Sequence, residues 1–293
     1  MYVDNLTENN QMNLAPLTDN IIKSFINQMA IDGNSNHTIQ AYNYYLRRFF
    51  LDTGKSVDGV THSDLTKWIS KFRWVDSSRY AILSILSSFS DWCIGRKLMT
   101  KNLVKKDDRP KKIKRTPRYL KEAELSAVEI EIEKQNLRNR CICEFFLSTG
   151  VRCNELRELM IKDLNPRERK ALITGKGKTE RKVEYSETCA LLLDRYIGNR
   201  TNPYEPLFLD RLGKQISNDA IRAMVKRLGI KAGLSRRLTP HMFRHTFATL
   251  KVIQGYTLQQ IGDMLGHEEL ENTKIYAQIL IPELMTLYDR YMR

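Results

Sequence analysis

The sequence lacks any apolar run that approaches the roughly 20 residues needed for a membrane-spanning helix. Its first residues are polar and acidic, without the basic start and the apolar stretch of a secretory signal. These two absences argue against a membrane protein and against a secreted one, so we expect a cytoplasmic chain. A hydrophobic content of 42% and a charged content of 28% are typical of globular proteins.

Cysteine is also scarce, and the five cysteines do not form a recognisable site. Their number is odd, they lack the spacing of metal ligands, and they fall in apolar helical patterns, which predicts reduced core residues. We therefore expect neither a disulfide framework nor a metal site. The five are Cys93, Cys141, Cys143, Cys153 and Cys189.

Acidic residues are few, with 34 Asp and Glu against 48 Lys and Arg, for a net charge of +14. Nucleic acid is the commonest partner of so basic a surface, although ribosomal and membrane-surface proteins are basic too. The excess is densest in residues 104–118, where eight basic residues accompany two acidic ones. Pro110 and Pro117 discourage helix there, which predicts an extended basic linker between two domains.

The basic residues of this linker are candidate contacts to DNA phosphates. The alternative is a solvated linker whose charge serves solubility, and the sequence alone leaves both open. The candidates are Lys105, Lys106, Arg109, Lys111, Lys112, Lys114, Arg115 and Arg118.

A length of 293 residues suits two domains, each with its own core. We expect a flexible N-terminus (1–17), a first, helical domain (18–103), the linker (104–118) and a second domain (119–293). Apolar residues three or four apart predict four helices before the linker. These begin at Thr18, at Ser35, at a Thr61 and Asp64 capping box, and near Ser77.

Beyond the linker the pattern is mainly helical with a small β-sheet. Helices are predicted near 121–134, 138–147, 186–198, 217–228, 257–265 and 271–279. Others begin after Gly150 and at Thr239, which Pro240 follows. Two strand-like runs, 171–174 and 181–185, flank the Gly-Lys-Gly-Lys of residues 175–178, which predicts a hairpin. A last amphipathic stretch, 282–291, offers an apolar face to its own core or to a neighbouring protomer.

Four motifs in this second part carry the chemistry. Residues 148–156, STGVRCNEL, resemble the T-G-x-R-x-x-E-L box of the tyrosine recombinases, the phage integrase family. Residues 240–245, PHMFRH, are similar to the H-x-x-R box of that family. Residues 265–267, LGH, followed by Tyr276 resemble its last box, and residues 174–178 its lysine-bearing hairpin. Each match alone is weak, but their order and structural settings agree with the family.

The residue types also suit phosphodiester chemistry. Two guanidiniums, of Arg152 and Arg244, can neutralise the non-bridging oxygens of a phosphate, since each stays charged and is a planar fork. His241 lies three residues before Arg244, so both project from one helix face. A phenol must lose its proton as it attacks, and His241 is the expected acceptor for Tyr276.

The resemblance assigns the remaining roles. Lys176 is the expected acid that protonates the departing 5′ oxygen, with Lys178 and Lys182 in the same hairpin as alternatives. His267 is expected to donate a hydrogen bond to the phosphate. Tyr276 is the expected nucleophile, with Tyr288 and Tyr291 as alternatives. Apart from the resemblance, His245 beside Arg244 is expected to be a packed, hydrogen-bonded histidine.

The resemblance implies a recombinase of the two-domain type, similar to Xer recombinases and transposon-borne resolvases. Its helical DNA-binding domain (18–103) and its catalytic domain (119–293) are expected to close around DNA. A 3′-phosphotyrosyl intermediate conserves the bond energy, so no ATP, metal or other cofactor is expected. The implied partners are a double-stranded recombination site, a homotetramer on two sites, and accessory DNA-bending proteins or a partner recombinase. Two alternatives remain: relaxation of DNA in the manner of a type IB topoisomerase, and DNA binding without catalysis.

Overall fold

The computed structural model describes residues 14–110, 118–175, 179–200 and 205–266, together with Thr273 and Tyr276. The chain divides into two compact units, Met1–Ile113 and Lys114–Arg293, each with its own hydrophobic core. In the part of the chain so described, no helix combines the length and apolar character that crossing a membrane requires.

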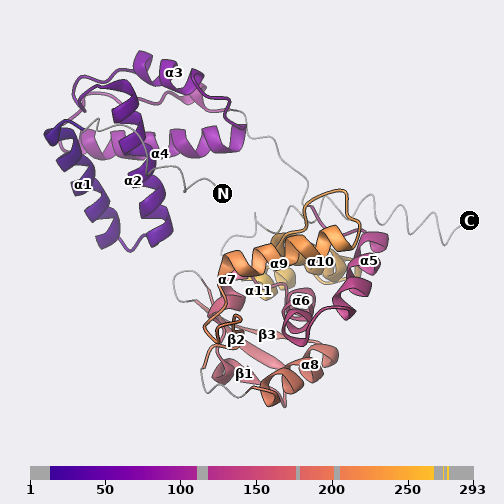
Figure 1. The fold of residues 1–293 in the computed structure, drawn as a ribbon. Helices are drawn as coiled ribbons and strands as arrows, with labels where there is room; N and C mark the ends of the chain where they lie inside the picture. Colours follow the sequence, from indigo (N-terminus) through magenta and orange to yellow (C-terminus); the bar gives the residue numbers. More distant parts are fainter. Residues whose placement is uncertain are drawn as a thin grey trace, which may run out of the picture. The chain divides into compact units, whose positions relative to one another are not determined.

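The first unit is a helical bundle, as its apolar spacing predicts. Helices α1 and α2 lie side by side and α4 packs against α2 (Figure 1). A 3-10 turn, η1, follows the bundle. The elements are α1 (Pro16–Ile31), α2 (Asn36–Thr53), α3 (His62–Ser70), α4 (Asp76–Gly95) and η1 (Lys106–Asp108).

Side-chain caps begin two of these helices where the sequence predicts them. The Ser35 hydroxyl accepts a hydrogen bond from the Thr38 amide at the start of α2, and Thr61 with Asp64 forms a capping box on α3. The prediction that Thr18 caps α1 is wrong. That helix begins at Pro16, because a proline fits the first helical position, and Thr18 lies buried inside it.

Aromatic residues fill the core of the first unit. Phe25 contacts Phe89 and Trp92 edge to face, with ring centroids 5.3 Å away in both cases. Leu103 and Val104 close the same core, so residue 104 packs with the bundle although its position in the basic segment predicts the start of the linker. Phe25 and Phe89 are buried and Trp92 is partly buried, so these three rings serve the core.

The second unit combines helices with a small sheet, which confirms the predicted fold class (Figure 1). Helix α6 lies at its centre, in contact with α5, α8 and α10. The helices are α5 (Glu122–Glu133), α6 (Leu137–Thr149), α7 (Cys153–Glu158), α8 (Glu187–Gly198), α9 (Asn218–Lys231), α10 (Pro240–Ile253) and α11 (Leu258–Leu265). The other elements are η2 (Ile161–Asp163) and strands β1 (Leu164–Asn165), β2 (Lys170–Thr174) and β3 (Glu180–Glu184).

The three strands form an antiparallel sheet in the order β1-β2-β3. Strands β2 and β3 are the predicted hairpin, paired from Lys170 with Glu184 to Thr174 with Glu180. The sequence does not predict strand β1, because two residues are too few to show an alternating pattern. Helix α11 and helix α6 both contact β3, and α7 contacts β2, so the hairpin lies against the elements that carry the motifs.

Candidate functional site

Arg152 stands at the N-terminal end of α7, two residues after the left-handed Gly150 that ends α6 (φ 62°). Its amide donates to Glu155 Oε2 at 2.7 Å, and its guanidinium Nη1 donates to Glu155 Oε1 at 2.7 Å. A third bond runs from Nη2 to the carbonyl of Gly266 at 3.3 Å. The side chain is still 37% exposed, so it is oriented by the protein and open to an anionic ligand.

Arg244 lies on α10 and is almost fully buried. Its guanidinium donates to the carbonyl oxygens of Gly150 at 2.8 Å and Leu265 at 2.7 Å. Burial, together with the charge of Arg152, lowers the pKa of Arg244 to about 10. The group still carries its charge at neutral pH, and its position is set by two helix ends.

Glu155 joins this pair of arginines to the hairpin. Burial would raise the pKa of its carboxyl, but hydrogen bonds from the Arg181 guanidinium and the Arg152 amide hold that pKa at about 2. Arg181, from β3, reaches both carboxylate oxygens of Glu155, at 3.1 and 2.7 Å. Neither residue is among the expected site residues, although Glu155 stands in the first motif.

Tyr276 is 1% exposed, packed among apolar residues of α10 and α11. Burial raises the pKa of its phenol to about 12, and the charges of Arg244 and Arg152 partly oppose that rise. The two predicted phosphate-binding arginines and the predicted nucleophile therefore lie in one electrostatic environment. At neutral pH the phenol keeps its proton, so attack requires an acceptor.

The hydrogen-bond partner of the phenol is His245, whose Nδ1 lies 2.8 Å from the Tyr276 oxygen. Burial, together with the nearby His241 and Arg244, lowers the pKa of His245 to about 4. The imidazole is therefore neutral at pH 7. The expectation of a packed, hydrogen-bonded histidine holds, but the sequence does not reveal that its partner is Tyr276, the predicted nucleophile. His245 and Tyr276 are 31 residues apart in the sequence, so no local sequence pattern could predict their contact.

His241 lies one helical turn before His245, with ring centroids 6.4 Å apart. The residue keeps an exposed surface, but the surrounding protein partly desolvates its ring. This desolvation, with the charges of Arg244 and Arg152, lowers the pKa of His241. Arg244 lies three residues further along the same helix, and the charge of Arg152, from α7, also reaches the ring. It is, however, His245 whose ring nitrogen contacts the phenol in the structure.

Two predicted catalytic residues, Lys176 and His267, lie outside the described residues. The same holds for Lys111, Lys112, Lys114 and Arg115 of the linker and for the amphipathic stretch 282–291. Among the remaining linker candidates, Lys105, Lys106 and Arg118 are exposed. Arg109 instead lies over the ring of Tyr80, 5.7 Å from its centroid.

The linker also differs locally from the predicted extended chain. A short 3-10 turn, η1, forms over Lys106–Asp108 because the Asp108 carboxylate accepts a hydrogen bond from the Lys105 amide at 2.6 Å. This turn leaves the Lys105 and Lys106 side chains exposed.

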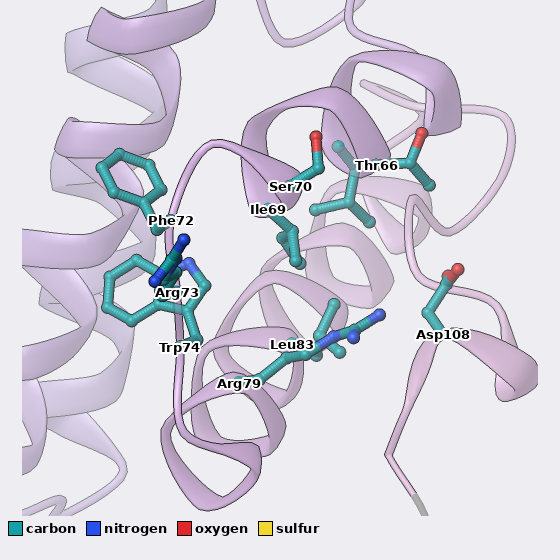
Figure 2. Close-up of a pocket in the computed structure, with 10 residues that line it drawn as sticks. Thr66, Ile69, Ser70, Phe72, Arg73, Trp74, Arg79, Leu83 and Asp108 are labelled. Carbon is teal, nitrogen blue, oxygen red and sulfur yellow. The ribbon is translucent and has the colours of Figure 1, made fainter.

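A small pocket in the first unit holds none of the candidate catalytic residues. Figure 2 shows Phe72, Trp74 and Arg79 among its lining side chains. Buried nitrogens of Trp74 and Arg79 have no hydrogen-bond partner among the described residues. Within those same residues, no cluster of three or more His, Cys, Asp and Glu side chains could hold a metal ion. All five cysteines are free and buried, as predicted.

The geometry suits the binding and attack of a phosphodiester. Arg152 and Arg244 supply fixed positive charge, and Tyr276 supplies a nucleophile held by a neutral imidazole. Two further residues that carry no predicted role, Glu155 and Arg181, connect the arginines to the sheet.

Comparison with known families matches both units. The model described as "Phage integrase family" covers residues 118–281, and the model described as "Phage integrase, N-terminal SAM-like domain" covers residues 22–97.

Individual relatives match over nearly the whole chain. Tyrosine recombinase XerA of Pyrococcus horikoshii is 30% identical over 279 residues, 94% of each chain. Tyrosine recombinase XerD of Staphylococcus epidermidis is 27% identical over 288 residues, 92% of this chain and 98% of the relative. A post-cleavage complex of the XerH site-specific recombinase with a palindromic difH substrate superposes with a TM-score of 0.73. It is 20% identical and covers 94% of this chain and 84% of that one.

Proposed function

This chain belongs to the phage integrase family of tyrosine recombinases, and we propose that it recombines DNA at specific sites through a covalent bond between Tyr276 and a DNA phosphate. Membership in the family makes it a DNA strand transferase. The observation that carries the site assignment is the convergence of Arg152, Arg244 and the His245-bound phenol of Tyr276.

Cleavage begins when the two guanidiniums bind the non-bridging oxygens of the scissile phosphate and offset its charge. The Tyr276 oxygen then forms a bond to phosphorus while the bond from phosphorus to the 5′ oxygen breaks. The phenolic proton passes to an imidazole. His241 is the acceptor expected from the motif, and His245 is the imidazole that contacts the phenol oxygen.

The leaving 5′ oxygen takes a proton from Lys176, the candidate acid of the hairpin, and His267 is the candidate donor to the phosphate. The products are a 3′-phosphotyrosyl bond and a free 5′ hydroxyl. The covalent bond keeps the energy of the phosphodiester, so rejoining to a new strand requires neither ATP nor a metal ion.

Exchange between two duplexes requires four strands to be cut, and each chain offers one Tyr276. We therefore propose a homotetramer on two double-stranded sites, with the basic linker against DNA phosphates. DNA-bending proteins or a partner recombinase complete the assembly where one chain alone is insufficient. We place the reaction in the cytoplasm, where the DNA of bacteria and archaea such as those of the matched relatives lies.

The test uses a supercoiled plasmid that carries two copies of a DNA site. This is the site that the protein occupies in the genome of its host. Wild-type protein is expected to give recombinant circles and a protein-linked 3′ end. Relaxation of any plasmid without recombinants would instead indicate a topoisomerase, and site binding without cleavage would indicate a protein that has lost catalysis. Adding host extract to a reaction that stalls at cleavage shows whether an accessory protein is needed.

A further inference from the structure

Three consecutive carbonyl groups at the C-terminal end of α11 each accept a hydrogen bond from a different arginine. Arg181 Nε donates to Met264 at 3.1 Å, Arg244 Nη2 to Leu265 at 2.7 Å and Arg152 Nη2 to Gly266 at 3.3 Å. The last carbonyls of a helix have no intrahelical donor and carry partial negative charge. The end of α11 is thus a common support for three guanidiniums, and only two of them are predicted site residues.

Arg181 belongs to strand β3, and its side chain is 13% exposed. Its two terminal nitrogens donate to the two carboxylate oxygens of Glu155, at 3.1 and 2.7 Å. Its third nitrogen, Nε, donates to the carbonyl of Met264. All three nitrogens therefore have partners within the protein. Such a buried fork is suited to orienting other groups and not to contacting DNA.

Glu155 is shared between Arg181 and Arg152. Its Oε1 accepts from the side chains of both arginines, and its Oε2 accepts from Arg181 and from the Arg152 amide. One carboxylate between two guanidiniums leaves one positive charge in excess. Without Arg181, the same carboxylate would neutralise Arg152 alone and hold it back from an anionic ligand.

Gly266 leaves room for the Arg181 side chain because it has no Cβ atom. A Cβ atom at this position would lie 2.8 Å from Arg181 Nη1 and 3.0 Å from its Cδ, and the backbone has a φ of 65°. A larger residue would displace the arginine from the end of α11. The close approach of Gly266 and Arg181 is therefore built into the local backbone.

We infer that Arg181 is a positioning residue for strand cleavage. It pairs with the Glu155 carboxylate and offsets its negative charge, so the Arg152 guanidinium stays oriented and its positive charge remains available to the scissile phosphate. The inference rests on the proposed function, because it presupposes that Arg152 binds that phosphate. It adds a residue whose position in a basic hairpin gives no signal of such a role.

The test measures single-turnover cleavage by the full chain of two DNA sites. One has an ordinary scissile phosphodiester and the other a methylphosphonate at the same position, which lacks the negative charge that Arg152 offsets. R181M is expected to cleave the phosphodiester at least about tenfold more slowly than wild type, since misplacing a catalytic group has effects of this order. On the methylphosphonate the ratio between wild type and variant is expected to approach one.

Two further variants separate charge from folding. In E155Q/R181M the carboxylate is removed with its partner, so cleavage of the phosphodiester is expected to recover in part. R181K keeps the charge, but one ammonium cannot span Glu155 and Met264 together, so an intermediate rate is expected. R169M, on an exposed arginine directly before β2 that pairs with Glu184, is the matched control and should cleave like wild type.

An equal loss on both substrates would mean that Arg181 only stabilises the fold and would overturn the inference. So would an R181M rate equal to wild type, or a double variant as slow as R181M. If wild-type protein cleaved neither substrate, the proposed function itself would fail, and that result is distinct from any of these.

Discussion

At the scale of single residues, the hydrogen bond between His245 and Tyr276 fixes the phenol that we propose as the nucleophile. A phenol with a pKa of about 12 faces an imidazole with a pKa of about 4, so both are uncharged at pH 7. This pairing fixes the buried phenol without ionising it, and full proton transfer in the free protein is strongly unfavourable. A bound phosphate, with its negative charge, favours the protonated imidazole and so makes transfer easier.

Substitution of His245 tests this control. H245A is expected to slow formation of the covalent complex by at least about tenfold, because the phenol loses the group that orients it. H245N is the matched control, since its amide can occupy the place of Nδ1 and should retain more of the rate. Single-turnover capture at saturating DNA is the measurement. Equal rates for H245A and wild type would show that the hydrogen bond has no part in cleavage.

The same histidine predicts a pH dependence of stability. Its folded pKa of about 4 is below the ordinary value of 6.5, so the unfolded chain binds a proton first as the pH falls. The stability that the neutral His245 contributes is fully present above pH 6.5 and is lost as the pH falls from 6.5 to 4. Its upper size is about 3 kcal/mol. Urea unfolding at about pH 7 and about pH 4.5 is expected to show a smaller drop in stability for H245N than for wild type. The same drop in both proteins would assign the effect to other groups.

At the scale of elements, the site is built from helix ends. Gly150 ends α6, and its carbonyl accepts from Arg244, while the end of α11 accepts from three arginines. The hairpin adds Arg181 from β3. Motion of any one of these ends would shift a guanidinium, so local backbone geometry and catalysis are coupled.

G150A tests that coupling. The φ of 62° disfavours alanine, and a Cβ atom would lie 2.5 Å from the Phe247 ring on α10. We expect about 2 to 4 kcal/mol of destabilisation from strain and overpacking together, along with slower cleavage. G54A is the matched control, because Gly54 ends α2 at a φ of 63° with nothing within 4 Å of the added atom. Denaturant unfolding should show a destabilisation of only about 1 kcal/mol for G54A, and equal effects of the two substitutions would contradict the account.

Local signals explain how much of these elements the sequence could predict. Ser35, Thr61 and Thr239 cap helices where expected, and Gly175 lies between the predicted strands, because caps and turns depend on neighbouring residues. The pairing of His245 with Tyr276 could not be predicted in this way. It joins positions that are distant in sequence, and only the packed fold brings them together.

At the scale of the whole molecule, two units are connected by the most basic segment of the chain. The four-helix unit buries Phe25, Phe49, Phe50, Trp68 and Phe89 in its core, so we expect any binding of DNA by this unit to depend mainly on charge. Lys105 and Lys106 are exposed at the start of η1, a few residues before the end of the first unit in the sequence. They are therefore the linker lysines whose effect on DNA binding is simplest to interpret.

Binding measured over a range of salt tests the linker. K105A/K106A is expected to lower the slope of log affinity against log salt concentration by about 0.9 for each DNA phosphate that these lysines neutralise. K23A/K134A is the matched control, because it removes two lysines that are 60% and 61% exposed and pair with acidic neighbours on their own helices or helix ends. Equal slopes for both double variants and wild type would support a linker that is basic for solubility alone.

Mapping the covalent bond between protein and DNA identifies the residue that attacks the phosphate. Wild-type protein is incubated with a DNA site that has a nick close to the scissile phosphate. Cleavage then releases a short fragment with the free 5′ hydroxyl, so the strand cannot be rejoined and the covalent intermediate is trapped. Proteolysis and mass spectrometry are then expected to find a 3′ nucleotide on the peptide that contains Tyr276. Y276F is expected to bind the same site with unchanged affinity and to form no adduct. An adduct on another residue, or one that persists in Y276F, would contradict the account.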